Sequence, residues 1–262
     1  MGLAILLAGC GSDGGTPRTP TPRVSSENVG STNDGDPASA GSAGTTSGRK
    51  RIVLLDPGHN GGDDPVELNR QVTDGRQGTN ACNTAGTSTD DGYPEHRFDW
   101  DVAKRVRALL NANGIIVAMT RENDTGAGPC VDVRGTMAEK IGADLMVSIH
   151  AYDGPPTGSG YHVSYSSPPL NEYQGQPSLS LATALRDALR GAGLQPSSHS
   201  GTAGLLPRAD LAGLNLARRP AALVECANMH NPQEAVVISN AIGRQRYANA
   251  IAAGIMAWLS GH

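Results

Sequence analysis

Short apolar runs alternate with amphipathic segments along most of the chain, a pattern that predicts an α/β fold. The runs are rich in β-branched residues and too short for helices, and they predict strands at residues 52–55, 115–119, 145–149, 161–165 and 220–224. Apolar residues at helical spacing predict helices at 98–110, 131–141, 181–189 and 251–259. We therefore expect a single domain with a mostly parallel or mixed twisted sheet and helices on both faces.

The first 48 residues lack this alternation. Residues 1–10 are apolar and end in Leu7-Ala8-Gly9-Cys10, which resembles the lipobox of a bacterial lipoprotein signal. We expect export and a lipid anchor through Cys10, with a disordered apolar leader as the alternative, because no Lys or Arg precedes the run. Residues 11–48 consist largely of Gly, Ser, Thr, Pro, Asn and Asp, which predicts a flexible tether to a folded domain at 49–262.

The charge and the aromatic content exclude some classes of partner. The formal net charge is -4 with scattered signs, which gives no basic footprint for a nucleic acid. Aromatic residues make up only 3% of the chain, so stacking platforms for bases or sugars are poorly supported. We expect a monomer without a nucleic-acid partner.

Two cysteines lie in long polar connections of a chain that we expect to be exported. Cys82 is in the loop 63–94, and Cys130 follows a segment rich in Gly and Pro. In an oxidising compartment such cysteines predict a disulfide, which would stabilise the fold by about 4 kcal/mol in the chain-entropy model. Free thiols on a mobile loop are the alternative. Cys226 follows an apolar strand, so we expect a buried and inert thiol.

Four candidate functional residues are predicted at the ends of these elements. His59 follows the turn after the first strand, Glu95 flanks the start of a helix, and His150 and Glu225 each follow a strand. Because ligands bind at the carboxyl ends of strands in open α/β sheets, we expect these side chains to converge. Two His and one Glu with an open fourth position form a catalytic zinc set. The separations of 36, 55 and 75 residues form no short motif, so a turn histidine and a dipole-stabilising carboxylate stay open as alternatives.

Six segments in order carry a resemblance to a known family. They read L-L-D-P-G-H-N-G-G, P-E-H-R-F-D-W-D-V-A, M-T-R-E-N-D, V-D-V-R-G-T-M-A, A-D-L-M-V-S-I-H-A and P-A-A-L-V-E-C-A-N-M-H-N-P-Q-E-A. Together they resemble the zinc-dependent N-acetylmuramoyl-L-alanine amidases of the amidase-3 type, over residues 51–259. The resemblance is greatest to the small mycobacterial-type members without a wall-binding domain.

The resemblance implies one Zn²⁺ per chain, held by His59, Glu95 and His150 at the carboxyl ends of the strands, with Glu225 as the catalytic carboxylate. The implied reaction cleaves the amide between N-acetylmuramic acid and L-alanine in peptidoglycan or muramyl peptides of the cell envelope. The alternatives are a zinc carboxypeptidase or peptidase and a non-catalytic wall-binding or regulatory relative. The presence of all four residues disfavours the last. Asp56 either orients a metal ligand or only forms the turn.

The chain also departs from the family pattern. Asn60 stands where glycine is usual, Asn215 stands where arginine is common, and the insertion 63–94 is long. The segment Cys226-Ala227-Asn228 is more polar than its family counterpart, and His96 is a competing ligand beside Glu95. The remaining histidines are His199, which we expect in an exposed loop, and His162, His230 and His262, for which the sequence shows no partner.

Overall fold

A six-stranded mixed sheet organises the part of the chain that the computed structural model describes, residues 49–262. Its strands are β1 (Ile52–Pro57), β4 (Ile116–Met119), β5 (Leu145–Tyr152), β6 (His162–Ser166), β7 (Leu205–Arg208) and β8 (Ala221–Asn228). The order is β4-β1-β5-β8-β6-β7, and only the β6–β8 pair is antiparallel. The predicted α/β domain with a mostly parallel sheet is confirmed, whereas the predicted signal (1–10) and tether (11–48) lie outside the described residues.

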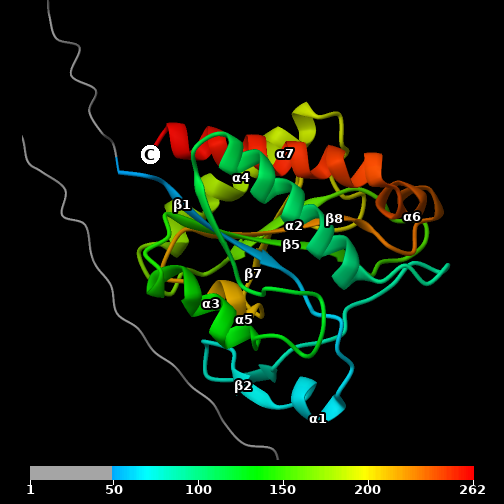
Figure 1. Cartoon of the computed structure of the whole chain (residues 1–262), viewed down its shortest axis with the longest axis horizontal. Helices are drawn as coiled ribbons and strands as arrows, with labels where there is room; N and C mark the ends of the chain where they lie inside the picture. Colours follow the sequence, from blue (N-terminus) through cyan, green and yellow to red (C-terminus); the bar gives the residue numbers. More distant parts are fainter. Residues whose placement is uncertain (1–48) are drawn as a thin grey trace, which may run out of the picture. The chain divides into compact units, whose positions relative to one another are not determined.

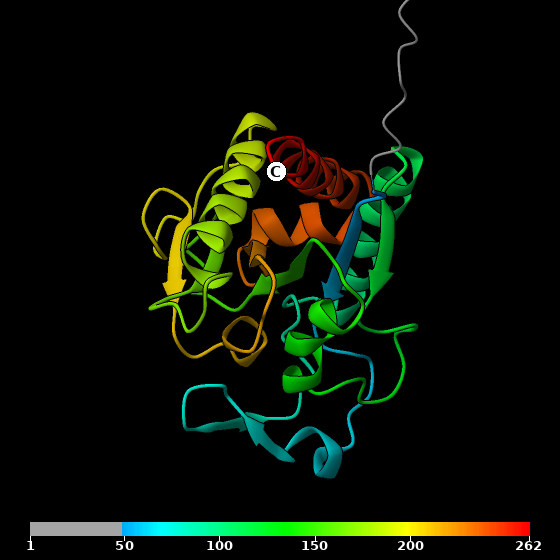
Figure 2. The same ribbon diagram turned by 90° about the vertical axis from the view of Figure 1, so that its left-hand side faces the viewer.

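Helices cover both faces of the sheet, as predicted. One face carries α2 (Glu95–Ala112), α4 (Leu179–Gly191) and α7 (Ala241–Ser260), and the other carries α3 (Val131–Lys140) and α5 (Ala212–Asn215) (Figure 1). The view in Figure 2 shows the same two layers from the side. A π-helical turn, η1 (Gln174–Ser178), leads into α4, and α6 (Pro232–Ser239) precedes α7.

The alternation of side chains along the strands divides the core in two. Val147 of β5 packs into the larger cluster beneath α2, α4 and α7, while Met146 packs into the smaller cluster beside α3 and α5. A central strand that is covered on both faces buries every apolar residue, which explains the unbroken apolar runs of the sequence. The amphipathic spacing of α2 buries Phe98, Val102 and Val106 in the larger cluster.

Two central strands are longer than predicted. His150 and Glu225, expected just after strands, lie inside β5 and β8 and form a pair in the parallel ladder. The strands continue through these polar residues because the hydrogen bonds of the ladder are made by the backbone and do not depend on the polarity of the side chain. The short strand β7 was not predicted, because its residues are at most half-buried and include Pro207.

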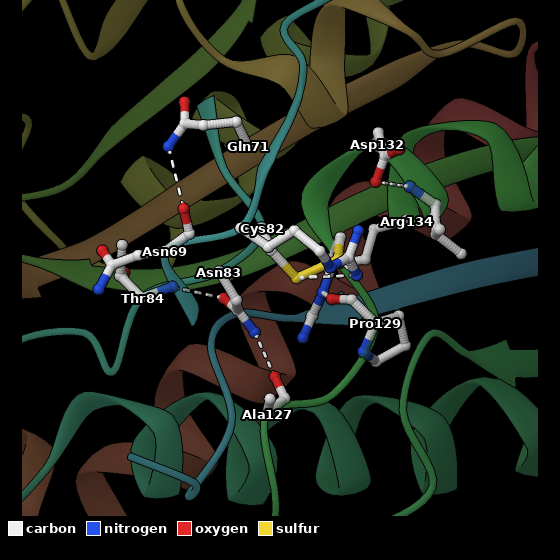
Figure 3. The surroundings of a disulfide bond; sticks show 12 residues. Asn69, Gln71, Cys82, Asn83, Thr84, Ala127, Pro129, Asp132 and Arg134 are labelled. Atoms are coloured by element: carbon white, nitrogen blue, oxygen red, sulfur yellow. Dashed lines mark hydrogen bonds between the residues drawn. A yellow bond between two sulfur atoms is a disulfide. The ribbon is translucent and has the colours of Figure 1, made fainter. Parts of the chain in front are cut away.

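The predicted long loop 63–94 contains structure of its own. A one-turn helix α1 (Pro65–Leu68) precedes the hairpin of β2 (Gln71–Thr73) and β3 (Thr79–Ala81). The predicted Cys82–Cys130 disulfide is confirmed and ties the end of this hairpin to the start of α3 (Figure 3). Beside it, Asn83 donates from Nδ2 to the carbonyl of Ala127 at 2.8 Å.

Cys226 is a buried free thiol, as expected. None of the helices within residues 49–262 combines the length and the apolar character that crossing a membrane requires.

Candidate active site

His59 stands on the loop directly after β1, as predicted. Gly58 donates from its backbone N–H to the carbonyl of Ile149, which ties the loop to the neighbouring strand. His59 has a φ of 54°, an uncommon conformation for a residue other than glycine. Its ring Nδ1 lies 2.9 Å from the Thr84 carbonyl and donates to it, so Nε2 is free to accept or to bind a metal.

Glu95 brings the three predicted metal ligands together. It is the first residue of α2, and its Oε1 lies 3.0 Å from His59 Nε2 and 2.9 Å from His150 Nδ1. In a tetrahedral zinc site with ligands at about 2.0–2.2 Å, neighbouring donor atoms are about 3.3 Å apart. The two distances to Oε1 of Glu95 are therefore within a few tenths of an ångström of the spacing that such a metal requires.

Two glycines make room for these ligands. A Cβ atom on Gly58 would lie 2.2 Å from Cε1 of His150, and one on Gly86 would lie 2.8 Å from Oε2 of Glu95. Gly86 also has a φ of 78°, which favours glycine. Both positions need the absence of a side chain because an imidazole or a carboxylate occupies the space.

The long polar loop forms one wall of the site. Besides the contact of Thr84 with His59, the backbone N–H of Thr87 donates to Oε2 of Glu95 at 2.9 Å. These residues follow Cys82 directly, so the disulfide anchors the segment that orients two candidate ligands. This contact with the ligands gives the insertion a role that its length alone did not reveal.

Burial and charge oppose each other at the candidate ligands. Burial alone would raise the pKa of Glu95, but the His59 and His150 rings lower that pKa well below its ordinary value. Burial disfavours the charged form of His150, yet the Glu95 hydrogen bond and the nearby Glu225 charge raise the pKa of His150 overall. The site is therefore an anionic cluster that favours a cation.

Asp99 is a fourth member of the cluster that the sequence reasoning missed. One donor atom from each of His59, Glu95, Asp99 and His150 lies within 4.8 Å of the others. Asp99 is fully buried, and neither carboxylate oxygen has a hydrogen-bond partner within residues 49–262. Burial and the nearby Glu95 charge raise its pKa well above the ordinary value. Its i,i+4 spacing from Glu95 on one helix face is the signal that could have found it.

Glu225 lies beside the cluster without belonging to it. It pairs with His150 across the β5–β8 ladder, and its Oε2 is buried without a hydrogen-bond partner in the described chain. Burial raises the pKa of Glu225 to about 7, with His150 opposing the shift and Glu95 adding to it. A buried carboxylate with a raised pKa beside this cluster can accept and return a proton.

Asp56 supports the site indirectly. Its carboxylate accepts hydrogen bonds from Thr120 Oγ1, Arg134 Nη1 and Ser148 Oγ at 2.7–2.9 Å, and it contacts no candidate ligand directly. Burial would raise the pKa of Asp56, but Arg134 and the two hydroxyls lower it. Arg134 in turn donates to the carbonyl of His59, so Asp56 acts on the ligand loop through this guanidinium.

The other candidate residues have partners elsewhere. His96 faces Asp124 with Nδ1 2.9 Å from each carboxylate oxygen, and it is not part of the cluster. His230 pairs with Asp90, and His262 donates to the carbonyl of Trp258. His199 is exposed, as expected. His162, in contrast, is buried.

Asn215, which stands where the family that the chain resembles commonly has an arginine, binds the guanidinium of an arginine from another segment. Arg76, from the turn of the β2–β3 hairpin, donates from Nε to the Asn215 side-chain oxygen at 3.0 Å. Asn215 donates back to the carbonyl of Asp74 at 3.0 Å. The asparagine at position 215 therefore binds the β2–β3 hairpin to the domain through two hydrogen bonds.

A pocket of about 310 Å³ opens beside the candidate ligands. His59 and His150 lie on its wall together with Thr84, while Leu214 and Leu223 supply apolar surface. The pocket therefore gives access to the cluster of candidate ligands from this side.

Comparisons with known proteins agree with this geometry. The family model Amidase_3, described as N-acetylmuramoyl-L-alanine amidase, matches residues 53–257. The chain is 48% identical over 209 residues to the N-acetylmuramoyl-L-alanine amidase Rv3717 of Mycobacterium tuberculosis, covering 80% of this chain and 86% of that protein. It is similar to the crystal structure of the amidase Ami1 of Mycobacterium smegmatis, with a TM-score of 0.80, 52% identity and coverage of 81% and 98%. Ami1 of Mycobacterium abscessus matches with a TM-score of 0.78, 50% identity and coverage of 80% and 98%.

Proposed function

The chain belongs to the N-acetylmuramoyl-L-alanine amidase family and is an enzyme of that activity, and on this premise we propose that it uses one zinc ion. His59, Glu95 and His150 would hold the metal. The observation that carries the proposal is the convergence of their donor atoms on Oε1 of Glu95, at 3.0 and 2.9 Å. Asp99, the fourth member of the cluster, has a raised pKa that favours its neutral form, so the other three residues leave an open fourth position, which suits a catalytic zinc site.

When bound, zinc would supply a Lewis acid for the scissile carbonyl and would lower the pKa of a coordinated water to about 7. The proton transfers fall to Glu225. In its ionised form it would accept the proton of the attacking water, and it would then return that proton to the leaving nitrogen of L-alanine. In the metal-free chain burial raises the pKa of Glu225 to about 7, and a raised pKa favours return of the proton to the leaving nitrogen.

The substrate proposed is the amide between the lactyl group of N-acetylmuramic acid and L-alanine, in peptidoglycan or in smaller muramyl peptides. The pocket beside His59 and His150 leaves space for groups on the substrate next to the metal. Export to the cell envelope, a lipid anchor through Cys10 and a monomeric state complete the proposal. Mass spectrometry of the amino-terminal peptide from cells and gel filtration test the anchor and the monomer.

One experiment tests the metal, the bond and the substrate size together. Metal analysis of the purified chain is combined with product identification on muramyl dipeptide and on intact peptidoglycan. We expect one zinc per chain and products with free L-alanine amino termini. Release of a carboxyl-terminal amino acid instead would identify a peptidase and contradict the proposed reaction.

The matched variant for this experiment is Glu225→Ala. Because Glu225 stands outside the metal-ligand cluster, this variant should keep its zinc and lose turnover. Unchanged turnover in Glu225→Ala would contradict the proposed role of this carboxylate.

A further inference from the structure

Three polar side chains form a row across the central strands of the sheet. Glu225 of β8 pairs in register with His150 of β5 on one side and with His162 of β6 on the other. Val163 and Val224, which neighbour His162 and Glu225, pack into the larger core cluster, so His162 and Glu225 project from the opposite face. His162 therefore flanks Glu225 on the side away from His150.

His162 and Glu225 both have unsatisfied hydrogen-bonding atoms. His162 is only 4% exposed, and its Nδ1 is buried without a partner within residues 49–262. Oε2 of Glu225 is unsatisfied in the same way. Unpaired polar atoms are costly in a protein interior, so two of them on directly opposed residues indicate a place where a polar ligand binds.

The surroundings of His162 fix both the orientation and the charge of its ring. The ring packs against Tyr152 with centroids 5.1 Å apart, and the Tyr152 hydroxyl donates to the carbonyl of Gly160. Burial, with Arg208 and His199 nearby, lowers the pKa of His162 to about 4. The imidazole is therefore neutral near neutral pH and offers one N–H donor and one acceptor nitrogen.

The direction of the substrate follows from the proposed function. If Glu225 returns the proton to the leaving nitrogen, the peptide attached to that nitrogen starts at Glu225. The metal ligand His150 lies on the β5 side of Glu225, where the scissile carbonyl belongs. The leaving peptide then extends over β6, on which His162 is the residue directly opposite Glu225.

We propose that His162 binds the leaving stem peptide, with a ring N–H donating to the carbonyl oxygen of L-alanine. That oxygen is three bonds from the leaving nitrogen, a reach of about 3–4 Å. Neighbouring strands are about 4.8 Å apart, so a side chain on β6 can meet a carbonyl that leaves Glu225 in this direction. This inference rests on the proposed amidase function and adds a residue that recognises the peptide half of the substrate.

The test uses the zinc-loaded full chain and compares His162→Ala, His162→Gln and Ser164→Ala on muramyl dipeptide. Loss of one hydrogen bond to the substrate predicts a KM about 10-fold higher in His162→Ala, with a smaller change in kcat. Inhibition by the dipeptide L-alanyl-D-glutamate should weaken by the same factor, while inhibition by N-acetylmuramic acid should be unchanged. Gln retains an N–H donor and should recover most of the peptide affinity.

Ser164→Ala is the matched control, because Ser164 is buried on the same face of β6 but pairs with Leu223 instead of Glu225. It should keep the KM of the unaltered chain. Thermal melting and zinc content of each variant exclude a loss of fold or of metal.

An unchanged KM and unchanged peptide inhibition in His162→Ala would overturn the inference, as would equal losses in His162→Ala and His162→Gln. Failure of the proposed function is a different result, because the unaltered chain would then release no free L-alanine amino terminus.

Discussion

Arg134 donates from Nη2 to the backbone carbonyl of His59 at 2.8 Å, so a buried cation holds the loop that carries the first candidate metal ligand. The same guanidinium donates from Nη1 to the Asp56 carboxylate at 2.9 Å and from Nε to the carbonyl of Pro129 at 2.8 Å. Only the fork of an arginine satisfies acceptors in several directions at once. The link explains how Asp56, which contacts no candidate ligand itself, still supports the site.

Arg134→Lys should therefore destabilise the protein although the charge is kept. An ammonium cannot reach all of these acceptors, and buried groups left unpaired cost about 3 kcal/mol or more in unfolding free energy. Urea unfolding of the metal-free chain measures the loss, and zinc titration should show weaker binding because the His59 loop is released. Arg105→Lys is the control, since Arg105 pairs with Asp101 at a partly exposed position. Similar losses in the two variants would contradict this role of Arg134.

Single substitutions should distinguish the candidate metal ligands from the histidine that lies beside them. We expect His59→Ala and His150→Ala to lose zinc and activity together, because each removes one of the donors that converge on Glu95. His96→Ala should keep its zinc, since His96 faces Asp124 outside the cluster. Metal analysis after gel filtration gives the answer, and zinc lost from His96→Ala but kept in His59→Ala would reverse the assignment.

The central elements of the fold could be predicted because burial leaves a pattern in the sequence. The strand at residues 52–55 is apolar throughout because both faces of β1 are covered, and α2 shows helical spacing because only one face is buried. The β2–β3 hairpin and β7 carry no such pattern, since most of their residues are partly or fully exposed. Backbone pairing defines both segments, and the disulfide anchors only the hairpin; neither leaves a periodic signal.

The candidate site was predictable only in part for a related reason. His59, His150 and Glu225 were found because strand ends and the family resemblance both point to them. Asp99 was missed because a polar residue within a helix ordinarily marks the solvent face, whereas its i,i+4 spacing places it beside Glu95 on the buried face of α2. The alignment of His162 with Glu225 depends on the β6–β8 register, which no local sequence encodes.

Asp99 should make the stability of the metal-free protein depend on pH. Its pKa is raised on folding, so the folded chain holds a proton that the unfolded chain releases above about pH 4. The stability that the protonated Asp99 gives to the folded state is therefore lost as the pH rises from about 4 upward. Asp99→Asn removes this titration, and its melting temperature should exceed that of the unaltered metal-free chain by a margin that grows toward about pH 8.

The control for this pH series is Asp101→Asn. The pKa of Asp101 is lowered, because the hydrogen bonds from Arg105 and Arg244 outweigh the effect of burial. Its contribution is present above about pH 4 and is lost as the pH falls, so Asp101→Asn should lower the melting temperature at neutral pH. If the melting temperature of Asp99→Asn exceeded that of the unaltered chain by the same amount at every pH, the raised pKa of Asp99 would be contradicted.

The disulfide should affect the metal site as well as stability. Cys82 and Cys130 close a 48-residue separation, so replacing both with Ser should lower the unfolding free energy by about 4 kcal/mol in the chain-entropy model. The bridge also anchors the segment in which Thr84 contacts His59 and Thr87 contacts Glu95. Zinc affinity should therefore fall in the double variant, even under conditions where the protein stays folded.

Reduction distinguishes the bridge from the third cysteine of the folded domain. A reductant should lower the urea midpoint of the unaltered chain and of Cys226→Ser, and it should leave the double variant unchanged, because Cys226 is a free thiol. Zinc affinity measured in the same samples should follow the state of the bridge. Loss of stability on reduction with full retention of zinc affinity would show that the loop residues hold His59 and Glu95 in place without the disulfide.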